Sequence, residues 1–181
     1  MHLCLTPSQM LDLWRLHSAY SPSLSDAVFV RNDGIDTTAI HLAELNRWYR
    51  RLLLEAPEEY LVATDYSTSV GLPAGTTDGA TVIPLPDDVV RILSVRLGSW
   101  RRPARIVTSP THIIAVRQRH PFTRATPSAP VALFHGGELH LYPAATPSDS
   151  ITTLRCVSYS EEEYRLDDSA FGWCSQYSPR M

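Results

Sequence analysis

The sequence predicts an α+β protein, with N-terminal amphipathic helices followed by a small antiparallel β-sandwich or barrel-like sheet and an extended C-terminal tail. Apolar residues first recur at helical spacing, over residues 1–59. Short apolar runs separated by Pro, Gly, Ser and Thr then follow, which is typical of strands. The 14 prolines also outnumber the 8 glycines, which suits short strands joined by stiff loops better than a helical bundle.

The first helix has a well-marked start. Thr6 can act as the N-cap, Pro7 suits the first helical position, and Gln9 completes a capping box. Apolar side chains at helical spacing follow, and Pro22 ends the run. We therefore expect an amphipathic helix that begins at Pro7.

A second helix is expected between a cap on Asp36 and Pro57, which ends or kinks it. The apolar residues in this range form one stripe, which is what a helix packed on a core requires. The stripe consists of Leu42, Leu45, Tyr49, Leu52 and Ala56.

The β-rich part begins at Tyr60. We expect seven short strands, which suggests a small sandwich or barrel-like sheet. They cover residues 60–64, 80–83, 92–97, 113–117, 131–134, 138–142 and 151–159. The segment His135–Gly137 is typical of a hairpin loop, and Pro86–Asp88 is typical of the start of a helical turn.

The expected organisation is a single domain over residues 1–159, with a helical part at 1–59 and a β-rich part at 60–159. Residues 160–181 are expected as a tail or docking arm, because they are acidic and then aromatic and show neither a strand nor a helix period. This tail either packs on its own domain or docks on a neighbour, since aromatic residues such as Trp173 and Tyr177 anchor interfaces.

Sequence motifs for catalysis or metal binding do not stand out. The seven histidines include no HExxH pair, the three cysteines form no CxxC pair, and there is no GxSxG motif. The segment Gly71–Gly75 lacks the Lys-Ser/Thr of a phosphate-binding loop. We therefore expect no enzymatic activity, no cofactor and no metal. No segment approaches the roughly 20 apolar residues of a membrane span, and the start does not resemble a secretory signal, so we expect synthesis in the cytoplasm and no membrane partner.

The charge is strongly segregated along the chain, although the net charge is only −3. Residues 89–137 contain no acid, and every basic residue in the chain is an arginine. The eight arginines of this segment are Arg91, Arg96, Arg101, Arg102, Arg105, Arg117, Arg119 and Arg124.

Three interpretations of the arginine-rich segment compete. It can be a solvated basic face, a nucleic-acid contact with Trp100 and Phe122 as stacking platforms, or a subunit interface. The third suits a segregated chain of nearly neutral total charge, because head-to-tail rings need two different complementary surfaces. We therefore expect the eight arginines, together with Trp173 and Tyr177, to lie at a subunit or partner interface.

The middle of the chain also resembles a family. Pro84–Val95 is similar to an "LPxDfxrixsv" segment and Gly98–Pro103 to a "GxWxRPv" segment, and both precede Thr126–Ala132 and Leu139–Ala144. Their order resembles neck proteins of tailed bacteriophages, which are the head–tail adaptor, ring or tail-tubular components beneath the portal. The chains of such adaptors usually end with a further helix after the last strand. The pattern of residues 161–181 does not predict such a helix.

The resemblance implies a structural virion protein of the phage neck or tail. Its subunits would form a homo-oligomeric ring that contacts the portal and other neck or tail proteins and surrounds DNA without reading its sequence. No catalytic residues follow from it. The alternative from the residues alone is a small cytosolic nucleic-acid-binding or regulatory module that uses the arginine-rich segment 91–124.

Overall fold

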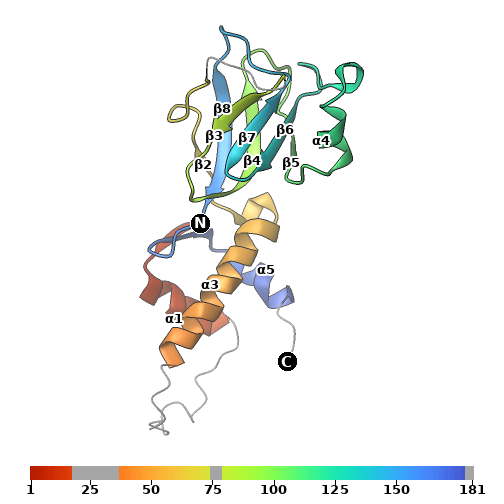
Figure 1. Ribbon diagram of the computed structural model, residues 1–181. Coiled ribbons are helices and arrows are strands. Elements are labelled where there is room, and N and C mark those ends of the chain that lie inside the picture. Colours follow the sequence, from red (N-terminus) through yellow and green to blue (C-terminus); the bar gives the residue numbers. More distant parts are fainter. Residues whose placement is uncertain (18–36, 74–78, 178–181) are drawn as a thin grey trace, which may run out of the picture. The chain divides into compact units, whose positions relative to one another are not determined.

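The computed structural model describes residues 1–17, 37–73 and 79–177, and it confirms the α+β class. The chain forms two compact units (Figure 1). Unit 1 comprises residues 1–62 and 159–181, and unit 2 comprises residues 63–158. The C-terminal residues therefore group with the N-terminal helices.

Two helices form most of unit 1. Helix α1 (Pro7–His17) begins with the expected capping box, in which the Thr6 N–H donates to Gln9 Oε1 at 3.1 Å and the Gln9 N–H lies 3.5 Å from Thr6 Oγ1. Helix α3 (Thr37–Glu55) buries Leu45 and Leu52 on its predicted stripe. The cap expected at Asp36 lies outside the described residues.

The C-terminal segment is not an extended tail. Strand β9 (Tyr164–Asp167) pairs antiparallel with β1 (His2–Leu5), and helix α5 (Ala170–Tyr177) follows it. Tyr164 and Leu166 are fully buried. Sequence reasoning missed this sheet because each strand has only four residues, too few for a clear alternation, and its partner lies at the other end of the chain.

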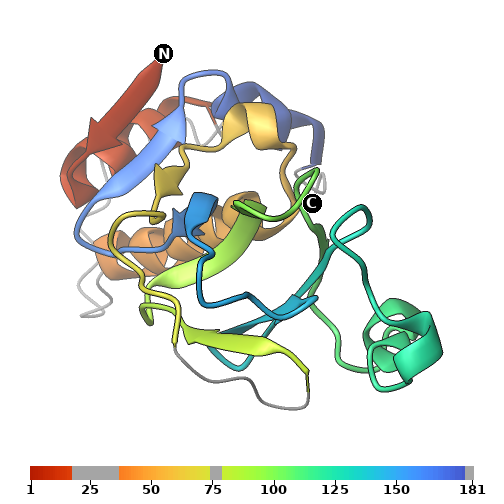
Figure 2. The same ribbon diagram turned by 90° about the horizontal axis from the view of Figure 1, so that it is seen from above.

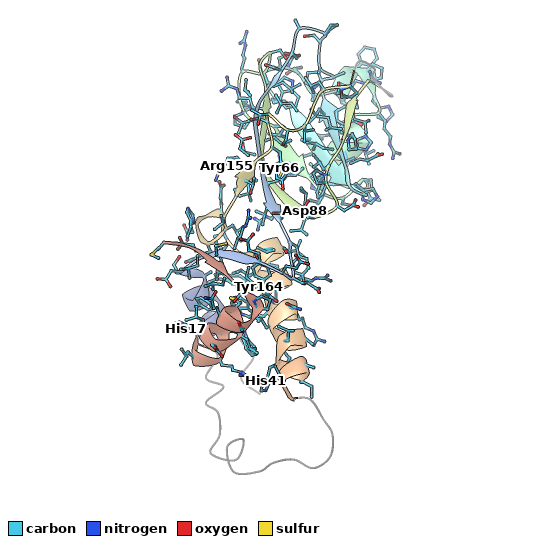
Figure 3. The ribbon with its side chains drawn as sticks, turned by 90° about the vertical axis from the view of Figure 1, so that its left-hand side faces the viewer. His17, His41, Tyr66, Asp88, Arg155 and Tyr164 are labelled. Carbon is cyan, nitrogen blue, oxygen red and sulfur yellow. The ribbon has the colours of Figure 1, made fainter. Side chains whose placement is uncertain are left out.

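Tyr49 joins helix α3 to the small sheet. Its buried hydroxyl donates to the Arg165 carbonyl at 3.1 Å and accepts from the Arg165 N–H at 3.0 Å. Burial raises the pKa of Tyr49 to about 12. Its ring meets that of Tyr164 edge-on at 4.9 Å, and the Tyr164 hydroxyl donates to Asn46. Figure 3 labels Tyr164 among the side chains of unit 1. Strand β9 is thus an integral part of the unit 1 core.

Unit 2 contains two sheets. The first has the order β2-β8-β4, from Thr64–Asp65, Ile151–Ser158 and Val89–Leu97. The second has the order β3-β7-β6-β5, from Thr81–Pro84, Glu138–Tyr142, Val131–His135 and Arg105–Val107. All pairings are antiparallel except the parallel pair β5–β6. One buried cluster draws side chains from both sheets, among them Ile83, Leu141, Val95 and Leu154, so the two sheets share a core.

Five of the seven expected strands correspond to β3, β4, β6, β7 and β8. The hairpin at residues 135–137 also forms, with positive φ values of 62° and 79° at Gly136 and Gly137 that suit glycine. The turn at Pro86–Asp88 is a reverse turn closed by the Val89 N–H on the Pro86 carbonyl, at 3.0 Å, and not the start of a helix.

Two strand predictions are wrong. Residues 113–117 form helix α4 (Ile113–Arg117), whose N-cap His112 accepts from the Ile114 N–H through Nδ1 at 3.2 Å. The β-branched residues of this segment favoured a strand, but the local cap prevails. Residues 58–60 form the 3₁₀ helix η1 (Glu58–Tyr60) after Pro57, which leaves only a two-residue strand at β2.

Asp149 braces the turn that follows β4. Its carboxylate accepts from the N–H and hydroxyl of Ser99, both at 2.9 Å, and from the N–H and hydroxyl of Thr146 at 2.8 and 3.0 Å. Partial burial alone would raise the pKa of Asp149, but these hydrogen bonds lower it below the ordinary carboxyl value. The ionised carboxylate therefore holds together two loops of unit 2.

We predict that Leu166→Ala destabilises unit 1 by about 3 kcal/mol, because it leaves a cavity at a fully buried position of β9. Urea unfolding followed by tryptophan fluorescence measures this free energy. The control is Leu54→Ala, since Leu54 is exposed on helix α3 and should change stability by less than about 0.5 kcal/mol. Equal effects of the two substitutions would contradict the placement of β9 in the core.

We predict that Asp149→Asn lowers stability by about 1–2 kcal/mol at neutral pH, because the amide replaces a charged acceptor of four hydrogen bonds. Since the folded pKa of Asp149 is lowered, the stabilisation is present above the ordinary carboxyl pKa of about 4 and is lost as the pH falls through the folded value. Urea unfolding against pH should show the two proteins converging below about pH 4. A difference in unfolding free energy that stays constant to lower pH would exclude this role of Asp149. The control is Asp87→Asn, on an exposed turn.

Candidate arginine-lined interface

The two compact units carry opposite charge. Unit 1 contains thirteen acids and seven arginines, a net charge of −6, whereas unit 2 contains six acids and nine arginines, a net charge of +3. The segregation seen along the sequence is therefore also a segregation between folded bodies. Eight of the nine arginines of unit 2 belong to the acid-free segment 89–137.

The chain leaves the second sheet between β5 and β6, and we call residues 108–130 the excursion. It contains helix α4 and the 3₁₀ helix η2 (Pro121–Thr123), and Figure 2 shows α4 at the side of unit 2, apart from the strands. A small core attaches it to the sheet, made of Val107, Ala115, Val131 and Leu133. The Arg101 N–H donates to the Pro127 carbonyl at 2.9 Å, which ties the end of the excursion to the turn after β4.

Gln118 is the polar residue that holds the excursion together. Its side chain is only 4% exposed. Its Nε2 donates to the Ile114 carbonyl and its Oε1 accepts from the Ala125 N–H, both at 2.8 Å. Its backbone carbonyl accepts from Arg124 Nε at 3.0 Å. Sequence reasoning did not single out Gln118, since a lone glutamine in a basic segment carries no signal that it will be buried.

Four of the predicted arginines converge on one hollow of unit 2. Arg102 and Arg105 approach it from the sheet side, and Arg117 and Arg124 approach it from the excursion. Its volume is about 300 Å³, and its other lining residues are uncharged. They are Ile114, Gln118, Thr123, Ala125, Thr126, Ala129, Pro130 and Val131. The hollow thus offers guanidinium and hydroxyl donors and no carboxylate.

Three guanidinium groups of this hollow have no acidic partner among the described residues. In the part of the chain that the structure describes, no carboxylate forms an ion pair with Arg102, Arg105 or Arg117. Arg124 is held in place by Gln118 and packs against Gly79, where a Cβ would lie 2.7 Å from its Nη1. Four like charges around one hollow repel each other, and an anion placed there would relieve this repulsion.

The remaining predicted interface residues do not join this hollow. Arg91 and Arg96 lie on β4, where Arg91 is half-buried and Arg96 Nε donates to the Trp100 carbonyl at 3.2 Å. Arg101 and Arg119 are exposed but do not line the hollow. Trp173 and Tyr177 belong to α5 in unit 1, and the Tyr177 side chain lies outside the described residues.

The two aromatic residues singled out in the segment have opposite environments. Trp100 is 1% exposed and packs in the shared core of unit 2, so it is not the stacking platform that the nucleic-acid interpretation would need. Phe122, in η2, is fully exposed, and Ile113 at the start of α4 is 60% exposed. Exposed apolar side chains beside arginines are a composition found at the centres of protein interfaces.

Among the described residues, little supports a metal site, a membrane span or a reactive thiol. No group of three His, Cys, Asp or Glu side chains there is arranged to hold a metal ion, and no described helix is long and apolar enough to span a bilayer. Burial raises the pKa of the Cys156 thiol to about 12, which disfavours the reactive thiolate.

Comparison with known proteins adds no family assignment. Neither the models of known protein families nor the sequences of curated proteins contain a match to this chain.

We predict that Gln118→Ala loosens the excursion and costs about 2 kcal/mol, because it leaves the Ala125 N–H without its acceptor in a partly buried position. Hydrogen exchange should become faster at the amides of residues 118–126. The neighbouring exposed Arg119→Ala is the control, with an expected change below about 0.5 kcal/mol. Unchanged exchange in the glutamine variant would show that the excursion is held by other contacts.

Proposed function

We propose that this protein is a structural subunit of a tailed bacteriophage virion, a head–tail adaptor or neck ring protein that oligomerises beneath the portal and connects the capsid to the tail. The observation that carries the proposal is the opposite charge of the two compact units, together with an exposed basic and apolar excursion on one of them. A closed ring of identical subunits needs two different surfaces that complement each other, and this chain offers an acidic and a basic one.

Three further features support the proposal. The chain combines N-terminal helices with a β-rich unit, as the resemblance implies. The segments that carry the resemblance, Pro84–Val95 and Gly98–Pro103, form the turn into β4, that strand, and the braced turn after it. A helix, α5, also follows the last strand, which is where adaptors of this kind close and where the sequence pattern gave no indication of one.

In this proposal the ring surrounds the path of the DNA and contacts the portal and other neck or tail proteins. The protein is made in the host cytoplasm and ends in the virion, and the assembly needs no catalysis or cofactor. DNA contact is incidental and follows the backbone charge, so any retention of DNA should fall steeply with salt and show no sequence preference.

A second candidate is a nucleic-acid-binding module, which the four convergent arginines and the exposed Phe122 favour. Titration of the purified protein with DNA separates the two. Tight, saturable binding by the free protein at physiological salt favours the module, and weak, salt-sensitive retention favours the ring subunit.

Quantitative mass spectrometry of purified particles from an infected or induced culture tests the proposed function. About a dozen copies per particle are expected for a closed ring of one subunit. Particles that form normally and lack this chain would overturn the virion proposal.

We predict that reversing Arg101 and Arg102 to Glu reduces incorporation of the chain into particles, because the basic surface then repels the acidic surface of its neighbour. Incorporation is measured as copies per particle in a complementation assay. Arg47→Glu, a reversal at an exposed position of α3 outside the basic segment, is the control. Normal incorporation of the double reversal would argue against assembly through this surface.

A further inference from the structure

One turn of unit 1 gathers enough acidic side chains to be a candidate binding partner for the arginine hollow. Residues 161–163 are three consecutive glutamates, the longest acidic run in the chain. They connect β8 of unit 2 to β9 of unit 1, and Glu161 and Glu162 are exposed. The run belongs to unit 1 and directly precedes β9, the last strand of the chain.

The acidic turn is ordered by its own hydrogen bonds. The Ser160 hydroxyl accepts from the Glu162 and Glu163 N–H groups, at 3.1 and 3.3 Å. The Glu163 carboxylate is bound by the Arg165 guanidinium within the unit. The turn is thus folded before any partner arrives, so binding it costs little ordering entropy.

The two preceding glutamates remain available for a partner. The Glu161 carboxylate accepts from the Tyr159 hydroxyl at 2.9 Å and lies 3.9 Å from the Arg50 guanidinium, which is a loose, exposed contact. Among the described residues the Glu162 carboxylate has no partner. The turn therefore presents two carboxylates outward on a fixed backbone.

We propose that Glu161 and Glu162 of one copy bind in the hollow between Arg102, Arg105, Arg117 and Arg124 of the next copy. The inference rests on the proposed ring function and names the contact that would build the ring. Guanidinium groups bind carboxylates in bidentate geometry, and the four arginines supply more donors than two carboxylates require. Phe122, on the same excursion, supplies an apolar contact beside the ion pairs.

Nucleic acid is the competing occupant, because phosphate would also be attracted to the arginines. The charges of the chain favour the acidic turn. Unit 1 carries −6 and the whole chain −3, so the net charge of the chain opposes the binding of a polyanion. A second copy brings a compact acidic group to the basic hollow, and its own basic hollow remains open for the following copy, as a ring requires.

The chain contains no lysine, which permits a direct test. The Arg105→Lys variant places a primary amine in the hollow, where a carbodiimide can join it to a touching carboxylate without a spacer. The full-length variant is cross-linked both in solution and in purified particles. We expect a covalent dimer whose linked peptides join residue 105 to Glu161 or Glu162, and the link should disappear when Glu161→Gln and Glu162→Gln are added. Arg155→Lys, exposed on β8 outside the hollow, is the matched control and should not link to this turn.

A second measurement covers the case in which a single variant folds or cross-links poorly. Reversing Arg102 and Arg105 to Glu, or Glu161 and Glu162 to Arg, should each weaken self-association at least about tenfold. An equimolar mixture of the two reversed proteins should associate again, because each interface in the mixture then pairs opposite charges. Failure of the mixture to associate, when each variant is folded by circular dichroism, would overturn the proposal.

The remaining outcomes are also decisive. Links from residue 105 that stay within one chain or reach only other carboxylates would overturn the proposed contact. So would DNA binding that is lost in the Arg105→Glu variant and unchanged by the glutamate substitutions, because nucleic acid would then be the occupant. If particles contain the chain but show no link, the ring function stands and this contact fails. If the link forms but particles lack the chain, the contact stands and the virion function fails.

Discussion

The long antiparallel pairing of β4 with β8 is the interaction on which the arginine surface depends. It places Val95 opposite Leu154 and Ile92 opposite Cys156, and all four side chains are buried. Where β4 ends, Asp149 braces the turn. The Ala104 N–H then donates to the Val95 carbonyl at 2.8 Å, directly before the chain enters β5. The exposed arginines of this turn are therefore held on a rigid support. The excursion that follows lies between β5 and β6 of the second sheet, which shares its core with the first.

Charge distribution turns this support into a candidate interface. A folded protein usually intersperses opposite charges on its surface, which limits repulsion and favours solubility. This chain instead places net negative charge on one compact unit and net positive charge on the other. The lining around Arg102, Arg105, Arg117 and Arg124 contains no acidic residue, so it gathers four positive groups at one place of unit 2. Such an arrangement is best explained by an anionic partner, and a second copy of the chain carries one.

Sequence patterns predicted the elements whose signals are local. Strand β6 is a short apolar run, β7 alternates between buried and more exposed residues, and the two meet at two glycines with positive φ, so the hairpin was predictable. The pairing of β1 with β9 was not, because both strands are short and lie at opposite ends of the chain. The arginine-rich segment was evident from composition, but its convergence on one hollow depends on the buried Gln118 and on the fold of the excursion, which no local pattern encodes. The same limit applies to Trp100, whose burial was missed.

Electron cryomicroscopy of the neck of purified particles would show which surfaces of adjacent copies meet. We expect a ring in which the excursion at residues 108–130 of each copy contacts unit 1 of its neighbour, with density for the acidic turn at Glu161 and Glu162 inside the arginine hollow. A ring in which the excursion faces the central channel, or a neck that contains no density for this fold, would contradict it.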